Sequence, residues 1–428
     1  MLDIKFIREN KELITKNNAT RNVKIDLDEL LDLDQEKLNL QKKIDELRAE
    51  RNKRSKTKPT EEEILLMRKL GEEVAGLEAL VEDKEEELRE LLFKVPNLTH
   101  DSVPHGKDET KNKVIRKWGE PKEFGFEPKD HLDLGEQLNI IDVKTAAEVT
   151  GSRFAYLKGK LAMLEFALLN HALSIVTNPE TIEKIAKENK ISVSTAPFIP
   201  IIPPVMIRPD VMHQMGRLEP REERYHIESD DLYLVGSAEH TLGPMYMGKT
   251  LAEKELPLRY VGFSTAFRRE AGSYGKDTKG IFRVHQFDKL ELESFTLPEN
   301  SLAEQDLFVT IQEHLMQTLE LPYQVVLKCT GDMGAPDYRE FDIETWIPSQ
   351  KRYRETHTSD LMTDYQSRRL NTKVKRSAGQ NEFVHMNDAT AFAIGRTLIA
   401  ILENYQKADG SIVVPEALRK YVSFDKIS

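Results

Sequence analysis

The sequence predicts an α+β protein in two parts, a long antiparallel helical coiled-coil arm followed by a larger domain whose antiparallel β-sheet is flanked by helices. Two observations predict this fold class. Apolar residues recur every three and four positions from about residue 27 to residue 93, and two strand-like segments surround a glycine-rich stretch at residues 272–275. At 428 residues the chain can hold two or three domains. We place the first domain at residues 1–106 and the second at residues 107–428.

The arm is expected at about residues 27–93 as two helices with a break near residues 58–60. Proline fits the first turn of a helix but not its interior, and Thr60 followed by three glutamates is a plausible N-cap with an acidic first turn. About 30 residues per helix would extend roughly 45 Å. The heptad positions are occupied by Leu30, Leu33, Lys37, Leu40, Ile44 and Leu47 in the first helix and by Met67, Leu70, Val74, Leu77, Val81, Lys84, Leu88 and Leu91 in the second.

The tip of this arm is basic in a chain whose net charge is -11. Between residues 41 and 58, lysines and arginines stand at positions 42, 43, 48, 51, 53, 54, 56 and 58, and acids only at 45, 46 and 50. The overall charge argues against indiscriminate nucleic-acid binding, which requires clustered cations. The tip is either a solvated coiled-coil surface or a local nucleic-acid contact.

The cysteine content and the N-terminal residues indicate the cellular compartment in which we expect the protein. The chain has one cysteine, Cys329, after a strand expected at residues 324–328, so we expect a buried thiol, no disulfide and no cysteine-based zinc site. Residues 1–6 lack a basic segment followed by an apolar one, and no apolar run approaches 18 residues. We expect no membrane segment and a cytoplasmic location.

Residues 261–292 predict two paired strands with opposite faces. Phe282, Val284, Leu290 and Leu292 would face the core, while Arg283, His285, Phe287, Lys289 and Glu291 share the other face, beside Arg268 and Glu270 of the preceding strand. Phe287 and Glu291 would lie about 13 Å apart. This face suits a ligand with a flat ring at one end and a small polar group at the other; a hairpin with a solvated charged face is the alternative.

The string FRREAGSYGKDTKGIFRVHQFDKLE at residues 267–291 closely resembles the second signature motif of class II aminoacyl-tRNA synthetases in its seryl form. Residues 130–135 and 151–159 resemble the start of the catalytic domain of that family. Residues 198–204, an apolar strand ending in prolines, resemble its first motif, and residues 390–405 resemble its third. The resemblance covers nearly the whole chain, arm included, and implies a six- to seven-stranded antiparallel catalytic sheet.

The activity that this resemblance implies is ATP-dependent attachment of serine to tRNA(Ser) through a seryl-adenylate, with selenocysteine tRNA as a possible further substrate. ATP, serine, tRNA(Ser) and Mg²⁺ are the implied ligands, no zinc is expected, and a homodimer is implied with the first motif at its interface. The arm is implied to bind the long variable arm of tRNA through basic residues that we place at Arg48, Arg51, Lys53, Arg54 and Lys56.

Carried onto this sequence, the resemblance assigns catalytic roles to Arg268, Glu270 and Arg396. Arg268 would bridge the amino-acid carboxylate and the α-phosphate, and Arg396 would hold the γ-phosphate. Phe287 would stack on adenine. The implied ATP-binding set is Arg268, Arg269, Glu270, Val284, Phe287, Glu355, Thr356, His357, Thr358 and Arg396, with Glu355 as a Mg²⁺ ligand and Thr358 as a possible second one.

The implied serine pocket consists of Ser237, Ala238, Glu239, Glu291 and Thr390. Glu291 would bind the serine hydroxyl, with Ser237 and Thr390 near the ammonium. Residues 237–239 resemble the loop usually written Thr-x-Glu in these enzymes, with serine in place of threonine; a plain helix cap is the alternative.

One position departs from the family pattern: Asp388 stands where seryl enzymes usually carry asparagine. It would either cap the helix expected at residues 390–405 or alter the amino-acid pocket. Two other functions stay open: activation of a serine-like amino acid for a carrier protein, and a non-catalytic tRNA-binding paralogue. The basic arm argues against the first, and the presence of Arg268, Glu270, Glu291 and Arg396 argues against the second.

Overall fold

A computed structural model describes residues 1–54, 60–271 and 279–428, which divide into two compact units, Met1–Leu98 and Thr99–Ser428. The boundary expected after residue 106 therefore falls inside the second unit. Hydrogen bonds explain the difference: Thr330 N donates to Pro104 O at 3.0 Å, and Gly106 N donates to Thr330 Oγ1 at 3.2 Å. These bonds join residues 99–106 to the β-rich unit.

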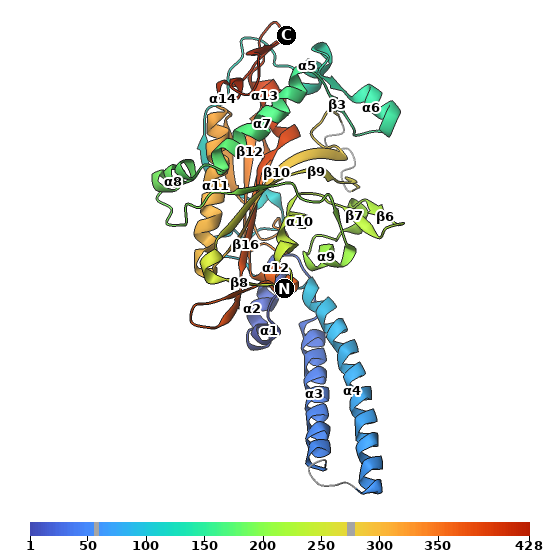
Figure 1. The fold of residues 1–428 in the computed structure, drawn as a ribbon. Coiled ribbons are helices and arrows are strands. Elements are labelled where there is room, and N and C mark those ends of the chain that lie inside the picture. The colour runs from blue at the N-terminus through green and yellow to red at the C-terminus, as the bar shows by residue number, and fades with distance from the viewer. Residues whose placement is uncertain (55–59, 272–278) are drawn as a thin grey trace. The chain divides into compact units, whose positions relative to one another are not determined.

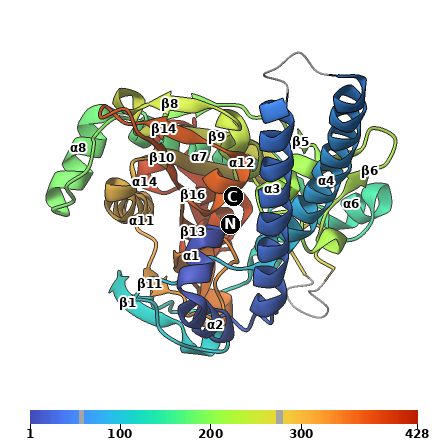
Figure 2. The same ribbon diagram turned by 90° about the horizontal axis from the view of Figure 1, so that it is seen from below.

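The first unit contains the predicted helical hairpin. Short helices α1 (Ile4–Glu9) and α2 (Lys11–Thr20) precede α3 (Leu27–Arg54) and α4 (Glu61–Lys94), which lie side by side in both views (Figures 1 and 2). The predicted cap is present, because Thr60 and Glu63 form a capping box at the start of α4. The heptad residues Leu40, Ile44, Leu47, Val74, Leu77 and Val81 form one apolar cluster between the helices.

Two lysines at heptad positions are explained by ion pairs across the hairpin. Lys37 Nζ lies 3.7 Å from Glu85, and Lys84 Nζ lies 3.2 Å from Glu36. The aliphatic part of a lysine side chain can cover apolar surface while its ammonium reaches the edge. A polar residue at a heptad position therefore pairs with the opposite helix here.

The second unit is built on an eight-stranded sheet, one strand more than the upper expectation. The strands run in the spatial order β1 (Lys113–Trp118), β11 (Tyr323–Leu327), β12 (Arg339–Ile347), β13 (Arg352–Thr363), β16 (His385–Ala393), β10 (Gln286–Thr296), β9 (Leu258–Phe267) and β4 (Ile199–Ile201). Neighbours pair antiparallel, except that β4 pairs parallel to β9. Strand β4, from the proline-ended first motif, lies at the sheet edge as predicted, because proline cannot donate to a ladder.

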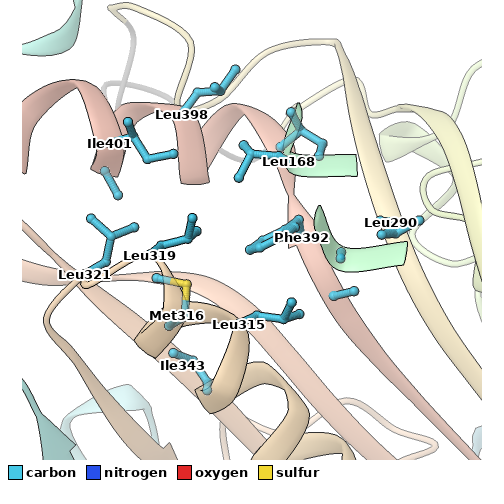
Figure 3. Close-up of a cluster of buried hydrophobic side chains, with 14 of the residues drawn as sticks. Leu168, Leu290, Leu315, Met316, Leu319, Leu321, Ile343, Phe392, Leu398 and Ile401 are labelled. Carbon is cyan, nitrogen blue, oxygen red and sulfur yellow. The ribbon is translucent and has the colours of Figure 1, made fainter. Parts of the chain in front are cut away.

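One face of this sheet packs on three helices, α7 (Lys160–Val176), α11 (Ser301–Thr318) and α13 (Ile394–Asn404). Figure 3 shows Leu290, Ile343 and Phe392 from the strands against Leu168 of α7, Leu315 and Met316 of α11, and Leu398 and Ile401 of α13. Cys329 is fully buried, as expected. Because this face holds the core, polar side chains on the strands are directed to the opposite face.

The remaining elements are short. The helices are α5 (His131–Gln137), α6 (Val143–Thr150), α8 (Pro179–Glu188), α9 (Pro209–Gln214), α10 (Glu239–Leu242), α12 (Tyr365–Leu370) and α14 (Glu416–Arg419). The strands are β2 (Ile141–Asp142), β3 (Tyr156–Leu157), β5 (Met206–Ile207), β6 (His226–Ile227), β7 (Leu232–Leu234), β8 (Thr250–Ala252), β14 (Lys373–Lys375), β15 (Asn381–Phe383), β17 (Ile412–Val413) and β18 (Lys426–Ile427). No single helix in the described ranges has the length and apolarity needed to cross a membrane; the bent pair of α7 and α8 meets that test by length and composition only.

Candidate active site

Four central strands bring oxygen-bearing side chains into one row on the face opposite the helices. The register pairs Glu291 of β10 with Thr390 of β16, and Thr358 of β13 with Asp342 of β12. Thr390 Oγ1 donates to Glu291 Oε1 at 3.0 Å and lies 3.4 Å from Thr358 Oγ1. The structure thus brings together two predicted serine-pocket residues and one predicted ATP contact.

The predicted hairpin forms, but its strands are shorter than expected. Strand β9 ends at Phe267 and β10 begins at Gln286, so Arg268 and Glu270 lie beyond the first strand and Val284 precedes the second. Glu270 adopts φ 52° and accepts a 3.0 Å hydrogen bond from Arg283 Nη1. This left-handed backbone is incompatible with strand alternation, so the chain turns at Glu270.

Arg268 holds a position between the two halves of the site. Its Nε donates to Gly236 O at 3.1 Å, next to the predicted serine loop, and its guanidinium lies 5.3 Å from the centre of the Phe287 ring. A planar guanidinium in this position can bond two oxygens of a ligand at once. The position fits the bridging role expected of this residue.

Two cavities open on this face. The smaller, of about 100 Å³, is lined by Arg268, Glu270, Val284, Phe287, Lys289, Glu355, Thr356, Thr358, Thr390 and Arg396, among others. The larger, of about 770 Å³, is lined by charged residues that include Lys328, Asp342, Glu344, Arg354, Glu355 and Arg396. Glu355 and Arg396 line both. An elongated anionic ligand could therefore pass from one into the other.

Arg396 is anchored at the junction of the cavities. Its Nη1 donates to Glu355 Oε1 at 2.8 Å and to Glu355 O at 3.1 Å. Desolvation opposes ionisation of Glu355, but Arg396 and Lys328 outweigh it and lower the pKa of this carboxyl to about 2. Phe282 belongs to the buried core, as predicted, and its ring also lies beneath Arg354 and Arg396, whose guanidinium carbons are 4.0 and 4.8 Å from the ring centre.

Two predicted ATP contacts, His357 and Arg269, do not line these two cavities. His357 is 1% exposed and packs near Phe392, since alternation turns it to the helix-covered face, and burial lowers its pKa to about 3. Arg269 lies over the ring of Tyr225 at 5.8 Å, and its backbone N donates to Glu223 O. The remaining predicted ATP contacts line the smaller cavity.

The predicted serine loop lies beside the Glu291 row. Lys289 Nζ donates to Ser237 Oγ at 3.2 Å and pairs with Glu291, which is 1% exposed. Ala238 is the N-cap of α10 and no side chain makes a capping hydrogen bond there, so Ser237 does not cap this helix. Glu239 is 8% exposed, and its Oε2 has no hydrogen-bond partner among the described residues. Sequence reasoning placed Lys289 on this face but gave it no role.

The carboxylates of the larger cavity fit a hard divalent cation. Asp342 and Glu355 line the same cavity from adjacent strands. Asp342 is 6% exposed, and its Oδ1 has no hydrogen-bond partner in the described part of the chain. Mg²⁺ prefers such carboxylate oxygens. Sequence reasoning missed Asp342, because a single acid in a strand gives no signal without its neighbours.

The helix-cap interpretation of Asp388 is wrong. The helix expected from residue 390 begins only at Ile394, and Asp388 lies inside β16 with 4% exposure. Its Oδ2 accepts a 3.3 Å bond from Arg217 Nη2. The cap interpretation failed because the residues just before the third motif belong to strand β16 and not to the first turn of a helix. An acid in that strand faces side chains from neighbouring segments and has no helix to cap.

Comparison with known proteins assigns the class first. Residues 223–405 match the family model of the tRNA synthetase class II core domain (G, H, P, S and T). The second unit, with its antiparallel sheet and the Arg268 and Arg396 site on one face, is a class II aminoacyl-tRNA synthetase core.

The remaining matches narrow the class to one family. Residues 1–99 match the Seryl-tRNA synthetase N-terminal domain. The chain is 41% identical over its full length to the serine–tRNA ligase of Thermodesulfovibrio yellowstonii, with 100% of both chains covered. It also resembles the Pyrococcus horikoshii seryl-tRNA synthetase complexed with ATP (39% identity, TM-score 0.88, 100% and 99% covered) and the Naegleria fowleri cytoplasmic enzyme in complex with AMP (31%, 0.86, 100% and 99%). The chain belongs to the serine–tRNA ligase family.

Proposed function

We propose that this chain activates serine with ATP and transfers the resulting seryl group to tRNA(Ser). The observation that carries the proposal is the position of Arg268, between the ring of Phe287 and the loop that leads into Glu239. A seryl-adenylate has an aromatic base at one end and an ammonium and hydroxyl at the other. The site offers a ring, a bridging cation and carboxylates in that order.

In the first step a serine carboxylate oxygen attacks the α-phosphorus of ATP, and pyrophosphate leaves. Two anions must be held in line while charge develops on the phosphate. Arg268 would contact both. Arg396 would hold the outer phosphates, because it lies where the smaller cavity opens into the larger one.

Serine selection would rest on polar groups beside Arg268, from the start of α10 and from the Glu291 row. The unpartnered Oε2 of Glu239 is the acceptor for the substrate ammonium. Glu291, which accepts a hydrogen bond from Thr390, would bind the substrate hydroxyl, with Thr390 and Ser237 near the ammonium. Alanine could not make these bonds and would leave buried polar groups unpaired, which is costly.

Mg²⁺ would be held by Glu355 and Asp342, whose oxygens line the phosphate side of the site. When bound, the ion would neutralise charge on the phosphate oxygens. Thr358 is a weaker candidate, because its hydroxyl is directed to Thr390 in the smaller cavity.

The arm would bind the tRNA. Arg48, Arg51, Lys53 and Arg54 lie in the last two turns of α3, and Lys56 lies outside the described residues. Arg48 pairs with Glu78 and Arg54 with Glu50, so these two cations must exchange a carboxylate for a phosphate on binding. Binding to selenocysteine tRNA and a cytoplasmic location stay predictions.

A homodimer is also proposed, through the first motif and α7. Ile202 is 87% exposed and Ile199 51%, and on α7 Phe166 is 58% and Met163 47% exposed. Apolar side chains of this size at a sheet edge and on a helix favour burial against a partner. Sedimentation of the purified chain would test this: a monomer at micromolar concentration would contradict it.

The decisive experiment is amino-acid-dependent pyrophosphate exchange with a panel of amino acids, followed by charging of tRNA. Serine-dependent exchange together with serylated tRNA(Ser) is expected. Exchange without charging would favour the carrier-protein alternative, and the absence of exchange with tRNA binding intact would favour the non-catalytic one.

A further inference from the structure

A second row of acids lies under the serine pocket. The register pairs Glu293 of β10 with Asp388 of β16, Asp388 with Asp360 of β13, and Asp360 with Glu340 of β12. These four side chains are 0%, 4%, 8% and 5% exposed. Each lies two residues along its strand from a member of the Glu291 row, hence on the same face and roughly 7 Å away.

Two cations face this row of four carboxyls. Lys328 Nζ lies 2.8 Å from Glu340 Oε1. Arg217 Nη2 lies 3.3 Å from Asp388 Oδ2 and 3.6 Å from Asp360 Oδ2. Both oxygens of Glu293 are without a hydrogen-bond partner within the described ranges, and burial raises the pKa of this carboxyl. Arg217 therefore carries the compensating charge for the two central acids.

The backbone fixes Arg217 above the row. Its backbone N donates to Met212 O at 3.2 Å, and its O accepts from Arg224 Nε at 3.0 Å. Arg217 is also close enough to Glu239 to affect it: burial opposes ionisation of Glu239, but neighbouring positive charges, Lys289 and Arg217 among them, outweigh it and lower its pKa. The guanidinium of Arg217 thus places a positive charge near both the acidic row and Glu239, the proposed acceptor for the substrate ammonium.

We propose that Arg217 is a positioning residue of the amino-acid pocket, whose guanidinium balances Asp388 and Asp360 and thereby keeps Glu239 available as an anion for the substrate ammonium. The inference rests on the proposed function. It gives Asp388 a physical explanation: an acid at the usual asparagine position is tolerated because Arg217 pairs with it.

Because Arg217 and Asp388 balance each other's charge, removing either one alone is expected to disturb the pocket. Removing one partner of a buried ion pair leaves an uncompensated charge, which is far more costly than removing both. Without Arg217, Glu239 would lose one of the positive charges that oppose the effect of burial, and its protonated form would be favoured. A neutral Glu239 would bind an ammonium poorly, whereas the ATP contacts lie on the other side of Arg268.

The test is serine-dependent pyrophosphate exchange by the full chain, with serine and ATP varied separately. We expect Arg217→Gln to raise the KM for serine at least tenfold and to leave the KM for ATP within twofold. Arg217→Gln with Asp388→Asn should return the serine KM to within threefold of wild type. Arg208→Gln is the matched control, because Arg208 is exposed and pairs only with nearby Asp210 in the described structure, and it should change neither constant.

Three outcomes would overturn the proposal: an unchanged serine KM in Arg217→Gln, a parallel rise in both KM values, or no recovery in the double variant. If the single variant does not fold, a folded double variant with near-normal serine KM still supports the proposal, and an unfolded one contradicts it. Wild-type chain without serine-dependent exchange would instead contradict the proposed function itself.

Discussion

Ion pairs in the arm and in the catalytic unit have similar lengths but different surroundings. Lys43 and Glu73 of the arm lie 2.9 Å apart, with side chains 53% and 47% exposed, whereas Arg217 and Asp388 lie 3.3 Å apart, with side chains 17% and 5% exposed. An exposed pair contributes about 0–1 kcal/mol, and breaking a buried one costs about 3–5 kcal/mol. The arm can exchange its carboxylate partners for phosphates at little cost, whereas the sheet holds its charges fixed.

The largest effect is expected from a change in a buried residue of the catalytic unit. Glu291→Ala should lower serine-dependent pyrophosphate exchange about 100-fold or more, because the substrate hydroxyl loses its acceptor and Lys289 and Thr390 lose a buried partner. The apparent affinity for ATP should stay within about twofold. Steady-state kinetics with each substrate varied would measure both, with the exposed Glu299→Ala as control. Near-normal exchange would exclude Glu291 as the serine contact.

Removal of the arm tip, residues 48–58, should separate the two steps of the reaction. Aminoacylation of tRNA(Ser) should fall about tenfold or more, because the phosphate-neutralising cations are lost. Adenylate formation should be unchanged, since the site residues lie in the other unit. Charging and pyrophosphate exchange measured on the same preparation would check this, and equal loss of both activities would refute the role of the arm.

A pH effect is expected from the acidic row. Burial raises the pKa of Asp360 from the usual aspartate value of about 4 to about 7. Between these values the folded state binds more protons than the unfolded state, so Asp360 makes the free energy of unfolding fall as pH rises from about 4 to 7. Asp360→Asn should flatten that dependence. Urea unfolding at several pH values would measure it; an unchanged slope would show that Asp360 is already ionised when folded.

The smallest effect is expected in the arm. Lys43→Ala should change the free energy of unfolding by less than about 1 kcal/mol, because its pair with Glu73 is half exposed and screened by salt. Val74→Ala, in the apolar seam of the same hairpin, is the comparison variant and should cost more. A loss from Lys43→Ala equal to that from Val74→Ala would remove the distinction between exposed and buried interactions in this hairpin.

The arm was predictable because its signals are local. Heptad spacing, the proline at residue 59 and the Thr60 cap all act within a few residues, and α3 and α4 begin and end close to the expected positions. The strand pair around residues 258–296 was predictable for the same reason, because Leu290 and Leu292 alternate with polar residues. Its ends were not, since the turn at Glu270 depends on a partner, Arg283, thirteen residues away.

The site residues that the sequence missed depend on pairings across the sheet. Phe282 was correctly assigned to the core, but the guanidiniums of Arg354 and Arg396 that lie over its ring beside the cavity come from other elements. Asp388 looked like a helix cap because it precedes a helical pattern. Its actual neighbours come from a strand ending at Thr363 and from a loop before residue 221. These contacts join residues that are far apart in the chain, so no local sequence pattern predicts them.

The sequence by itself determined the two-part architecture, the family resemblance and most of the residues that line the candidate site, because these follow from short-range periodicity and ordered motifs. Only the tertiary structure decided which buried acids have a positively charged side chain beside them. Strand register sets Glu293, Asp388, Asp360 and Glu340 side by side, and a distant loop supplies Arg217. The free energy of a buried charge depends on its neighbours in space, and those neighbours are fixed only when the sheet has formed.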